Sequence, residues 1–426
     1  MVQLDERAVV RRLHDRLGTG PRPGDLDRTF DAALDAVLAE DPSGDVPPPQ
    51  PASPPRPAKG DRAAKQDAAH QRNEDDHALT TWWLDRMVTT TRPALERMTW
   101  FWHGHFATSE QKVRSPRAML AQNETFRALG LGPFADLAQA LVVDPALLVW
   151  LDGNDNRAGA PNENLAREFM ELFTLGVGHY GEPDVREAAR ALTGWTVRAD
   201  TGKAELVAKR HDDSQKTVFG QAAKFTAKSL VELLLNRAES PEFVVGRVWF
   251  RLVSAQPPPA DVVARLVPAF RRDTRSLLRA MASEAAFRDP ANALVKQPVE
   301  WAAGLMRAVG VRPRDLERKQ ADALLKALRG LGQTPFRPPS VGGWPAGGAW
   351  LTTATWPSRL DLAKLVADRA ALKTALGTAD RIEGVRRLLG VDSWSDRTRT
   401  ALGKVSGNPA QLVVVAANSP EYVVSR

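Results

Sequence analysis

The first residues that could carry chemistry are two histidines around a glycine, because His103, Gly104 and His105 close an aromatic segment that begins at Trp100. Imidazoles bind transition metals and transfer protons near neutral pH. Gly104 can adopt backbone conformations closed to other residues, so we expect it to turn both imidazoles toward one point. The alternative interpretation is an ordinary helix end, where histidines hydrogen-bond the last carbonyls and interact favourably with the helix dipole.

Three carboxylates follow on the segment from Pro161 to Gly176, which has the apolar spacing of a helix. At about 100° per residue, Glu168 flanks the apolar stripe, whereas Glu163 and Glu171 lie further round the helix. These last two stand four residues before and after Arg167, which is the spacing of a surface ion-pair ladder. A carboxylate beside apolar side chains needs a partner, so Glu168 is the stronger candidate for a site, with pairing to a buried arginine as the alternative.

A third candidate is the adjacent pair His211 and Asp212. It lies within residues 194–220, where short apolar–polar alternations separated by turn residues predict a small β-hairpin. The pair could supply one metal ligand with a charged neighbour, or it could simply cap a turn.

One hypothesis joins these candidates in a metal site within a helical pocket. Its ligands would be His103, His105, Glu168 and His211, and Glu163 or Glu171 would add a further ligand or an acid–base group. Imidazole with carboxylate suits zinc, iron or manganese, and an open coordination position would support hydrolysis or oxidation. The sequence therefore predicts a metal-dependent hydrolase or oxidoreductase, with these glutamates as its catalytic groups.

The elements that must position these groups are mostly helices. Apolar residues recur at spacings of three and four through most of residues 77–426, which predicts a large, bundle-like, mainly α domain with a β-hairpin excursion near 194–220. Residues 1–40 are predicted as a separate N-terminal helical segment. Residues 41–76 are rich in proline and poor in large apolar side chains, so we expect an exposed linker or insertion there.

Composition narrows the functional classes. The chain has 426 residues, a formal net charge of +7 and no cysteine, which excludes disulfides and thiolate sites. No phosphate-binding glycine loop or dinucleotide fingerprint occurs, so no nucleotide cofactor is expected. Arginines are interspersed with acids, so we expect no nucleic-acid partner. No segment has the ~20 apolar residues of a membrane span, and the first residues lack an export signal, so a cytoplasmic location is expected.

A loop rich in glycine, proline and tryptophan is predicted from Gly332 to Trp356. Tryptophan is favoured at binding hot spots, so Trp344, Trp350 and Trp356 could dock a partner protein on a non-catalytic scaffold. Carbohydrate binding by the same rings is a weaker hypothesis. Burial of these tryptophans in the core is the alternative to both.

Several of these segments also form long motifs. They are LERMTWFWHGHFATS at 95–109, APNENLAREFMELFTLGVGHY at 160–180, HDDSQKTVFG at 211–220 and GQTPFRPPSVGGWPAGGAW at 332–350. With them the chain resembles a large bacterial family labelled as a domain of unknown function and numbered eighteen hundred. Together with shorter matching stretches, these motifs span residues 77–360, and the resemblance covers most of the chain.

The resemblance implies a mostly helical protein but brings no reaction with it. It implies a signature set that comprises His103, His105, Asn162, Glu163, Asn164, Glu168, Glu171, His211 and Asp212. Family members are often exported and encoded beside sulfatase-like proteins, which implies a sulfatase-like partner and a location outside the cytoplasm as the alternative. The proline-rich insertion at 41–76 departs from the family pattern.

Overall fold

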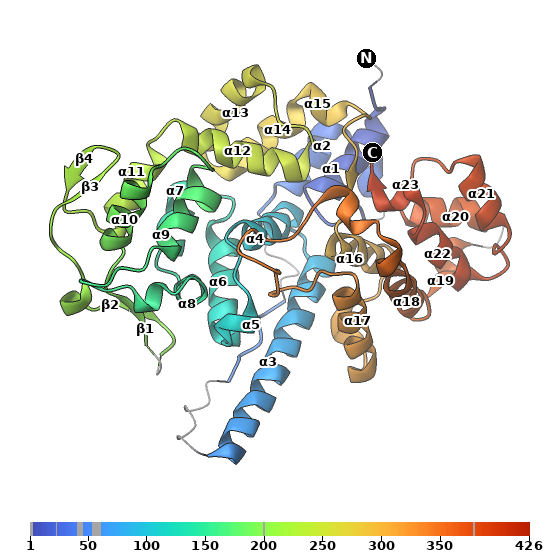
Figure 1. Ribbon diagram of the computed structural model, residues 1–426. Coiled ribbons are helices and arrows are strands. Elements are labelled where there is room, and N and C mark those ends of the chain that lie inside the picture. The colour runs from blue at the N-terminus through green and yellow to red at the C-terminus, as the bar shows by residue number, and fades with distance from the viewer. Residues whose placement is uncertain (1–2, 23, 41–45, 53–60, 199–200, 378–379) are drawn as a thin grey trace.

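The computed structural model describes residues 3–22, 24–40, 46–52, 61–198, 201–377 and 380–426. In these ranges the chain forms 23 α-helices and three small antiparallel two-stranded sheets. The prediction of a mainly α fold with little strand is therefore confirmed (Figure 1).

The helices have the following bounds. The first ten are α1 (Glu6–Arg16), α2 (Phe30–Val37), α3 (Arg62–Thr89), α4 (Pro93–His105), α5 (Glu110–Val113), α6 (Pro116–Leu129), α7 (Phe134–Leu141), α8 (Pro145–Trp150), α9 (Asn164–Glu168) and α10 (Glu182–Ala191). The next eight are α11 (Ala227–Leu235), α12 (Glu239–Leu252), α13 (Ala260–Arg272), α14 (Thr274–Ser283), α15 (Ala285–Arg288), α16 (Pro298–Val309), α17 (Arg318–Gly330) and α18 (Trp356–Ala367). The last five are α19 (Leu372–Leu376), α20 (Arg381–Leu388), α21 (Asp396–Gly403), α22 (Pro409–Ala417) and α23 (Pro420–Val423).

The strands pair as three short ribbons. They are β1 (Trp195–Val197) with β2 (Ala204–Leu206), β3 (Lys216–Val218) with β4 (Gln221–Ala223), and β5 (Leu294–Val295) with β6 (Val424–Ser425). The segment 194–220 thus contains one complete hairpin and starts a second, where the sequence predicted one; residues 199–200 lie outside the described ranges. The third ribbon ties the C-terminal end of the chain to the loop before α16.

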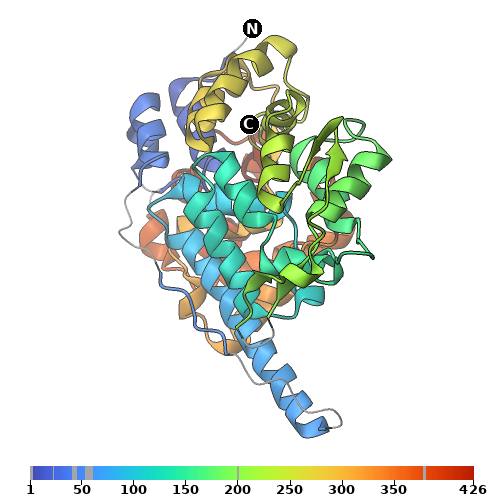
Figure 2. The same ribbon diagram turned by 90° about the vertical axis from the view of Figure 1, so that its left-hand side faces the viewer.

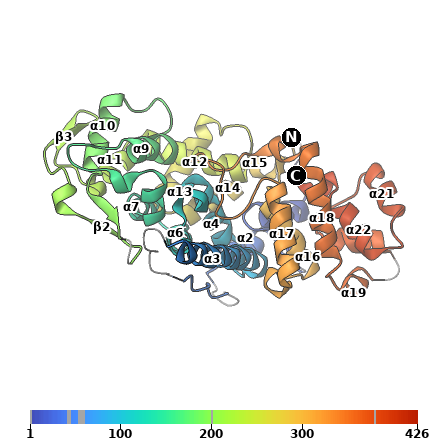
Figure 3. The same cartoon turned by 60° about the horizontal axis from the view of Figure 1, so that its bottom comes forward.

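Helix α4 lies between two hydrophobic clusters. One cluster is built mostly from α1, α2 and α6 to α15, and it includes Met98 and Trp102 of α4. The other is built mostly from α3 and α16 to α23, and it includes Trp100 of α4. Figure 3 shows α10 and α11 at one end of the elongated molecule, α21 and α22 at the other, and α4 between them. Side chains on opposite faces of α4 therefore enter different cores.

The structure adds detail at both ends of the proline-rich segment. Helix α3 begins at Arg62, inside the predicted linker, because Asp61 caps its first turn by accepting from the Ala64 N–H and no proline follows Pro57 until Pro93. The first turns of α3 are exposed and project from the body (Figure 2). The N-terminal helices α1 and α2 bury Val9, Leu13 and Phe30 in the first cluster, together with residues of α6 to α15.

Candidate functional site

Helix α4 does not break at Gly104, which corrects the expected turn. Pro93 occupies its first turn, and the helix continues through His105 without a positive φ at Gly104. Residues two apart on a helix point about 200° apart, so His103 and His105 face opposite sides. The two imidazoles therefore enter different surroundings and do not converge.

His103 is an aromatic core residue. Its ring is 5.3 Å from Trp83, 5.4 Å from Trp344 and 5.5 Å from Phe336, measured between centroids. Burial lowers the pKa of His103 to about 3, and Nε2 has no hydrogen-bond partner. The neutral imidazole therefore packs like an aromatic side chain, as is usual when no partner for a charge is present.

His105 faces a different element, a wide helical turn at Phe169–Thr174 that continues α9 with π-helical geometry. The distance between His105 Nε2 and the Phe173 carbonyl oxygen is 2.9 Å, so Nε2–H donates to that oxygen. Burial lowers the pKa of His105 to about 3, with the charges of Arg247 and Arg251 acting in the same direction. The neutral ring leaves Nδ1 as an acceptor without a partner.

The same π turn explains the positions of the glutamates. Because the π turn is wider than an α-helical turn, Met170 is fully buried in the core and Leu172 is only half-buried. The apolar stripe that we extrapolated at 100° per residue is therefore out of phase with the buried face after Glu168. Glu168 is half-buried, and burial followed by the charge of Glu171 raises its pKa. Glu171 accepts a hydrogen bond from the Tyr180 hydroxyl.

Glu163 takes part in the surface ion-pair ladder that its spacing from Arg167 predicts. Its Oε2 is 2.9 Å from Arg167 Nη2, and Arg167 also pairs with Glu182 at 2.6 Å. The expected ion pair is therefore present on the N-terminal side of Arg167. An exposed pair of this kind stabilises the protein only slightly.

The remaining signature residues make local structural bonds. His211 Nδ1 lies 2.9 Å from the Thr193 carbonyl oxygen, and Asp212 accepts from Arg190 Nε at 2.8 Å, which holds the pKa of Asp212 well below its usual range. Asn162 accepts from the Asn164 N–H at 3.0 Å, as in an Asx turn. Asn164 Nδ2 donates to Asp152 at 3.3 Å. These residues fix the loops around α9 and α10.

The four side chains proposed as metal ligands are therefore not brought together. Within the described ranges, no group of three or more histidine and carboxylate side chains lies close enough to hold a metal ion. The physical reason is the continuous helix at Gly104, which sends His103 into one core and His105 into the other. The divalent metal stays a prediction.

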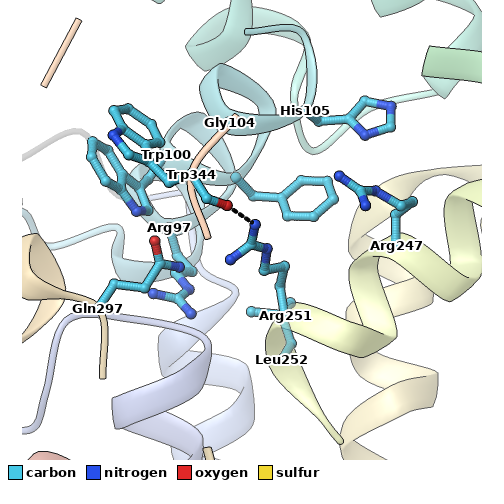
Figure 4. Close-up of a pocket in the computed structure, with 10 residues that line it drawn as sticks. Arg97, Trp100, Gly104, His105, Arg247, Arg251, Leu252, Gln297 and Trp344 are labelled. Carbon is cyan, nitrogen blue, oxygen red and sulfur yellow. Dashed lines mark hydrogen bonds between the residues drawn. The ribbon is translucent and has the colours of Figure 1, made fainter. Parts of the chain in front are cut away.

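A cavity lies beside His105, where α4, α12 and the tryptophan-rich loop meet (Figure 4). Its lining comprises Arg97, Trp100, Phe101, Gly104, His105, Arg247, Arg251, Leu252, Gln297 and Trp344. The enclosed space is about 20 Å³, and a second cavity of about 30 Å³ lies next to it and shares Arg97, Arg251 and Gln297. Each is large enough for a water-sized group.

Three arginines give this cavity a positive charge. Arg97 forms an ion pair with Glu300, and Arg251 donates to the carbonyl oxygens of Trp344 at 2.6 Å and Pro345 at 3.0 Å. Arg247 has no hydrogen bond or ion pair with any described residue, and burial lowers its pKa. Two guanidinium groups thus lack a carboxylate partner beside the unpartnered Nδ1 of His105.

These arginines were missed in the sequence, although one signal was present. Arg247 and Arg251 stand four residues apart in the otherwise apolar segment FVVGRVWFRL, so a helix must place both on one face. Charged side chains within an apolar helix need a partner or a ligand. The carbonyl oxygens of Trp344 and Pro345 come from a loop more than ninety residues away, so their role follows only from the folded structure.

The tryptophan-rich loop covers the cavity. Trp344 is buried and stacks on Trp100, with ring centroids 4.6 Å apart and planes inclined by 19°. Trp350 is also buried, so these two rings belong to the core, as the alternative interpretation holds. Trp356 is 47% exposed and remains accessible to a partner.

Fold and cavity together define a mainly helical protein with an aromatic centre and a cationic pocket. The family described as "Protein of unknown function (DUF1800)" matches residues 12–424, and the chain belongs to this family. Neither curated proteins nor solved structures give a match. None of the helices in the described ranges is both long and apolar enough to cross a membrane.

Proposed function

We propose that the cavity beside His105 binds a small oxyanion, namely the carboxylate, sulfate or phosphate group of a ligand. The observation that supports this proposal is the half-buried guanidinium of Arg247, which has no partner among the described residues. A charge taken from water without a counter-ion is unfavourable, and an anion would remove that cost. Arginine binds these planar or tetrahedral anions through its fork of N–H donors.

The surrounding groups suit recognition better than proton transfer. Nδ1 of His105 can accept a hydrogen bond from a ligand hydroxyl beside the anion, since Nε2–H is already committed to Phe173. With a pKa of about 3 the imidazole is a weak base near neutral pH. Arg251 lines both small cavities, each of which holds only a water-sized group, so entry of a sulfate or phosphate group requires a shift of this side chain that joins them.

Replacement of Arg247 by glutamine tests the proposal. Sulfate, phosphate and acetate are titrated separately into the wild-type protein at constant ionic strength, with binding measured by calorimetry. The variant should bind the preferred anion about tenfold more weakly, because a hydrogen bond to a charged group is lost. The exposed Arg272 on α13 provides the control, since Arg272→Gln removes the same charge away from the cavity. Equal affinity in wild type and Arg247→Gln would contradict the proposal.

The metal-dependent hydrolase or oxidoreductase predicted from the sequence stays a second proposal. Elemental analysis of the purified protein tests it, with about one equivalent of zinc, iron or manganese expected if Glu168 and the histidines are ligands. His103→Ala should then lower the metal content. Metal far below one equivalent in wild type would contradict it, and that result leaves the anion proposal untouched.

The scaffold with a sulfatase-like partner also stays a proposal. Among the three tryptophans considered for docking, the exposed Trp356 supports it most, since Trp344 and Trp350 are buried. Helix α18 begins at Trp356, so this ring lies at the junction of the loop and the C-terminal helices.

A further inference from the structure

A mainly apolar hollow lies at the other end of the tryptophan-rich loop and shares no lining residue with the cavity beside His105. It is formed by residues 350–353, 355, 356 and 359 on one side and by residues 418, 420, 423 and 424 on the other. Its volume of about 400 Å³ falls within the range of small-molecule sites in proteins. None of its lining residues belongs to the cavity beside His105, so the two sites are separate.

The walls of this hollow, which we call the C-terminal groove, are mainly apolar. Leu351 is 52% exposed and Trp356 is 47% exposed, and both line the groove together with Val423. Large apolar side chains left this accessible next to one another mark a place where an apolar group can be buried. The groove therefore favours a ligand with a hydrocarbon body.

One buried cation supplies the polar end. Arg359 is 2% exposed and lines the groove, yet no carboxylate in the described ranges forms an ion pair with it. Nη2 donates to the Trp350 carbonyl oxygen at 3.3 Å, and the guanidinium lies 4.8 Å from the Trp301 ring centroid. Nη1 has no hydrogen-bond partner. Burial without a compensating negative charge lowers the pKa of Arg359 to about 10.

Two further polar atoms of lining residues lack partners. They are Nε1 of Trp350, which can only donate, and Oδ1 of Asn418, which can only accept. Buried polar groups in folded proteins are almost always hydrogen-bonded, so these two atoms and Nη1 of Arg359 have free capacity to bind a polar group. An ionised carboxylate can accept from Arg359 Nη1 and Trp350 Nε1, whereas only a protonated carboxyl group could donate to Asn418 Oδ1.

We propose that the C-terminal groove binds a small amphipathic carboxylic acid, with its hydrocarbon part against Leu351 and Trp356 and its carboxylate toward Arg359. The volume selects a small molecule over a polypeptide segment, and the single buried cation selects a monoanion. This inference is independent of the anion proposed for the cavity beside His105. Decanoate is a suitable probe because it combines a flexible hydrocarbon chain with one carboxylate.

The first test compares decanoate with decan-1-ol, which has the same chain and no charge. Binding is followed by the change in tryptophan fluorescence that contact with Trp356 should produce. Decanoate should bind wild-type protein about tenfold more tightly than decan-1-ol, because only the carboxylate brings a negative charge to the guanidinium of Arg359. Arg359→Gln should remove this preference, whereas Arg314→Gln, at a surface arginine with a 57% exposed side chain, should leave it unchanged.

A second pair of variants does not depend on a buried residue. Leu351→Glu and Leu351→Lys remove the same exposed apolar side chain and introduce opposite charges at the mouth of the groove. Decanoate should bind the lysine variant at least about tenfold more tightly than the glutamate variant, and decan-1-ol should bind both equally. Equal binding of decanoate and decan-1-ol to wild type, or no difference between the two Leu351 variants, would overturn the proposal.

Discussion

Replacement of Glu96 by glutamine should lower the free energy of unfolding by about 3–5 kcal/mol, because it removes the negative charge from a buried ion-pair network and keeps the positive charges. Glu96 is fully buried on α4 and accepts from Arg86 Nε and Arg127 Nε, each at 2.7 Å, and from Arg127 Nη2 at 3.1 Å. The two arginines come from α3 and α6, so one carboxylate joins three helices at the centre of the molecule. Equilibrium unfolding in urea measures the change.

Glu124 offers a matched control at the rim of this network. It also pairs with Arg127, but its side chain is 44% exposed. Glu124→Gln should therefore cost no more than about 1 kcal/mol, as is usual for solvent-exposed ion pairs. Similar losses of unfolding free energy in the Glu96 and Glu124 variants would show that the contribution of each ion pair does not depend on its burial.

The same carboxylate predicts a pH dependence. Burial alone would raise the pKa of Glu96, but the charges and hydrogen bonds of Arg127 and Arg86 lower it to about 2 from the ordinary 4.5. The folded protein therefore holds this group ionised where the unfolded chain would protonate it. The stabilisation is complete above about pH 4.5 and is lost as the pH falls toward 2, so the gap in stability between wild type and Glu96→Gln should narrow over that interval.

The fold class followed from periodicity because helical spacing is a local property of the sequence. Pro93 and Asp144 mark the starts of α4 and α8, as helix-start signals should. The exposed start of α3 was missed because prolines and small residues nearby dominated the composition of 41–76. Helix-forming residues after Asp61 were the signal that would have corrected it.

The arrangement of the site was less predictable, for two physical reasons. Gly104 permits a turn but does not require one, and packing of α4 between two cores kept it helical. The π turn at Phe169–Thr174 changes the phase of the helix, which no count at a fixed angle per residue can anticipate. The cationic cavity joins Arg97, Arg247 and a distant loop, so it arises only from tertiary contacts.

Replacement of Gly343 by alanine should detach the tryptophan-rich loop from α4. Gly343 has φ +79°, and a Cβ at this position would lie within 3.1 Å of the carbonyl carbon of Gly104 and still closer to its oxygen. Both atoms belong to the helix backbone, which cannot move aside. The loop must therefore shift, with loss of the Trp344–Trp100 stack and of the hydrogen bonds from Arg251. We expect a loss of about 4 kcal/mol in unfolding free energy.

The variant Gly347→Ala serves as a control, because it measures the cost of a left-handed backbone conformation without the steric clash. It lies in the same loop with φ +61°, but a Cβ there would have no atom within 4 Å. Gly347→Ala should therefore cost only the ~1–2 kcal/mol of a non-glycine residue in this region. Because the roof of the cavity depends on the contact between Gly343 and Gly104, Gly343→Ala should also weaken oxyanion binding, whereas Gly347→Ala should preserve it. Equal losses of stability in the two variants would mean that the loop does not approach α4 this closely, and the enclosed anion site would then lack its roof.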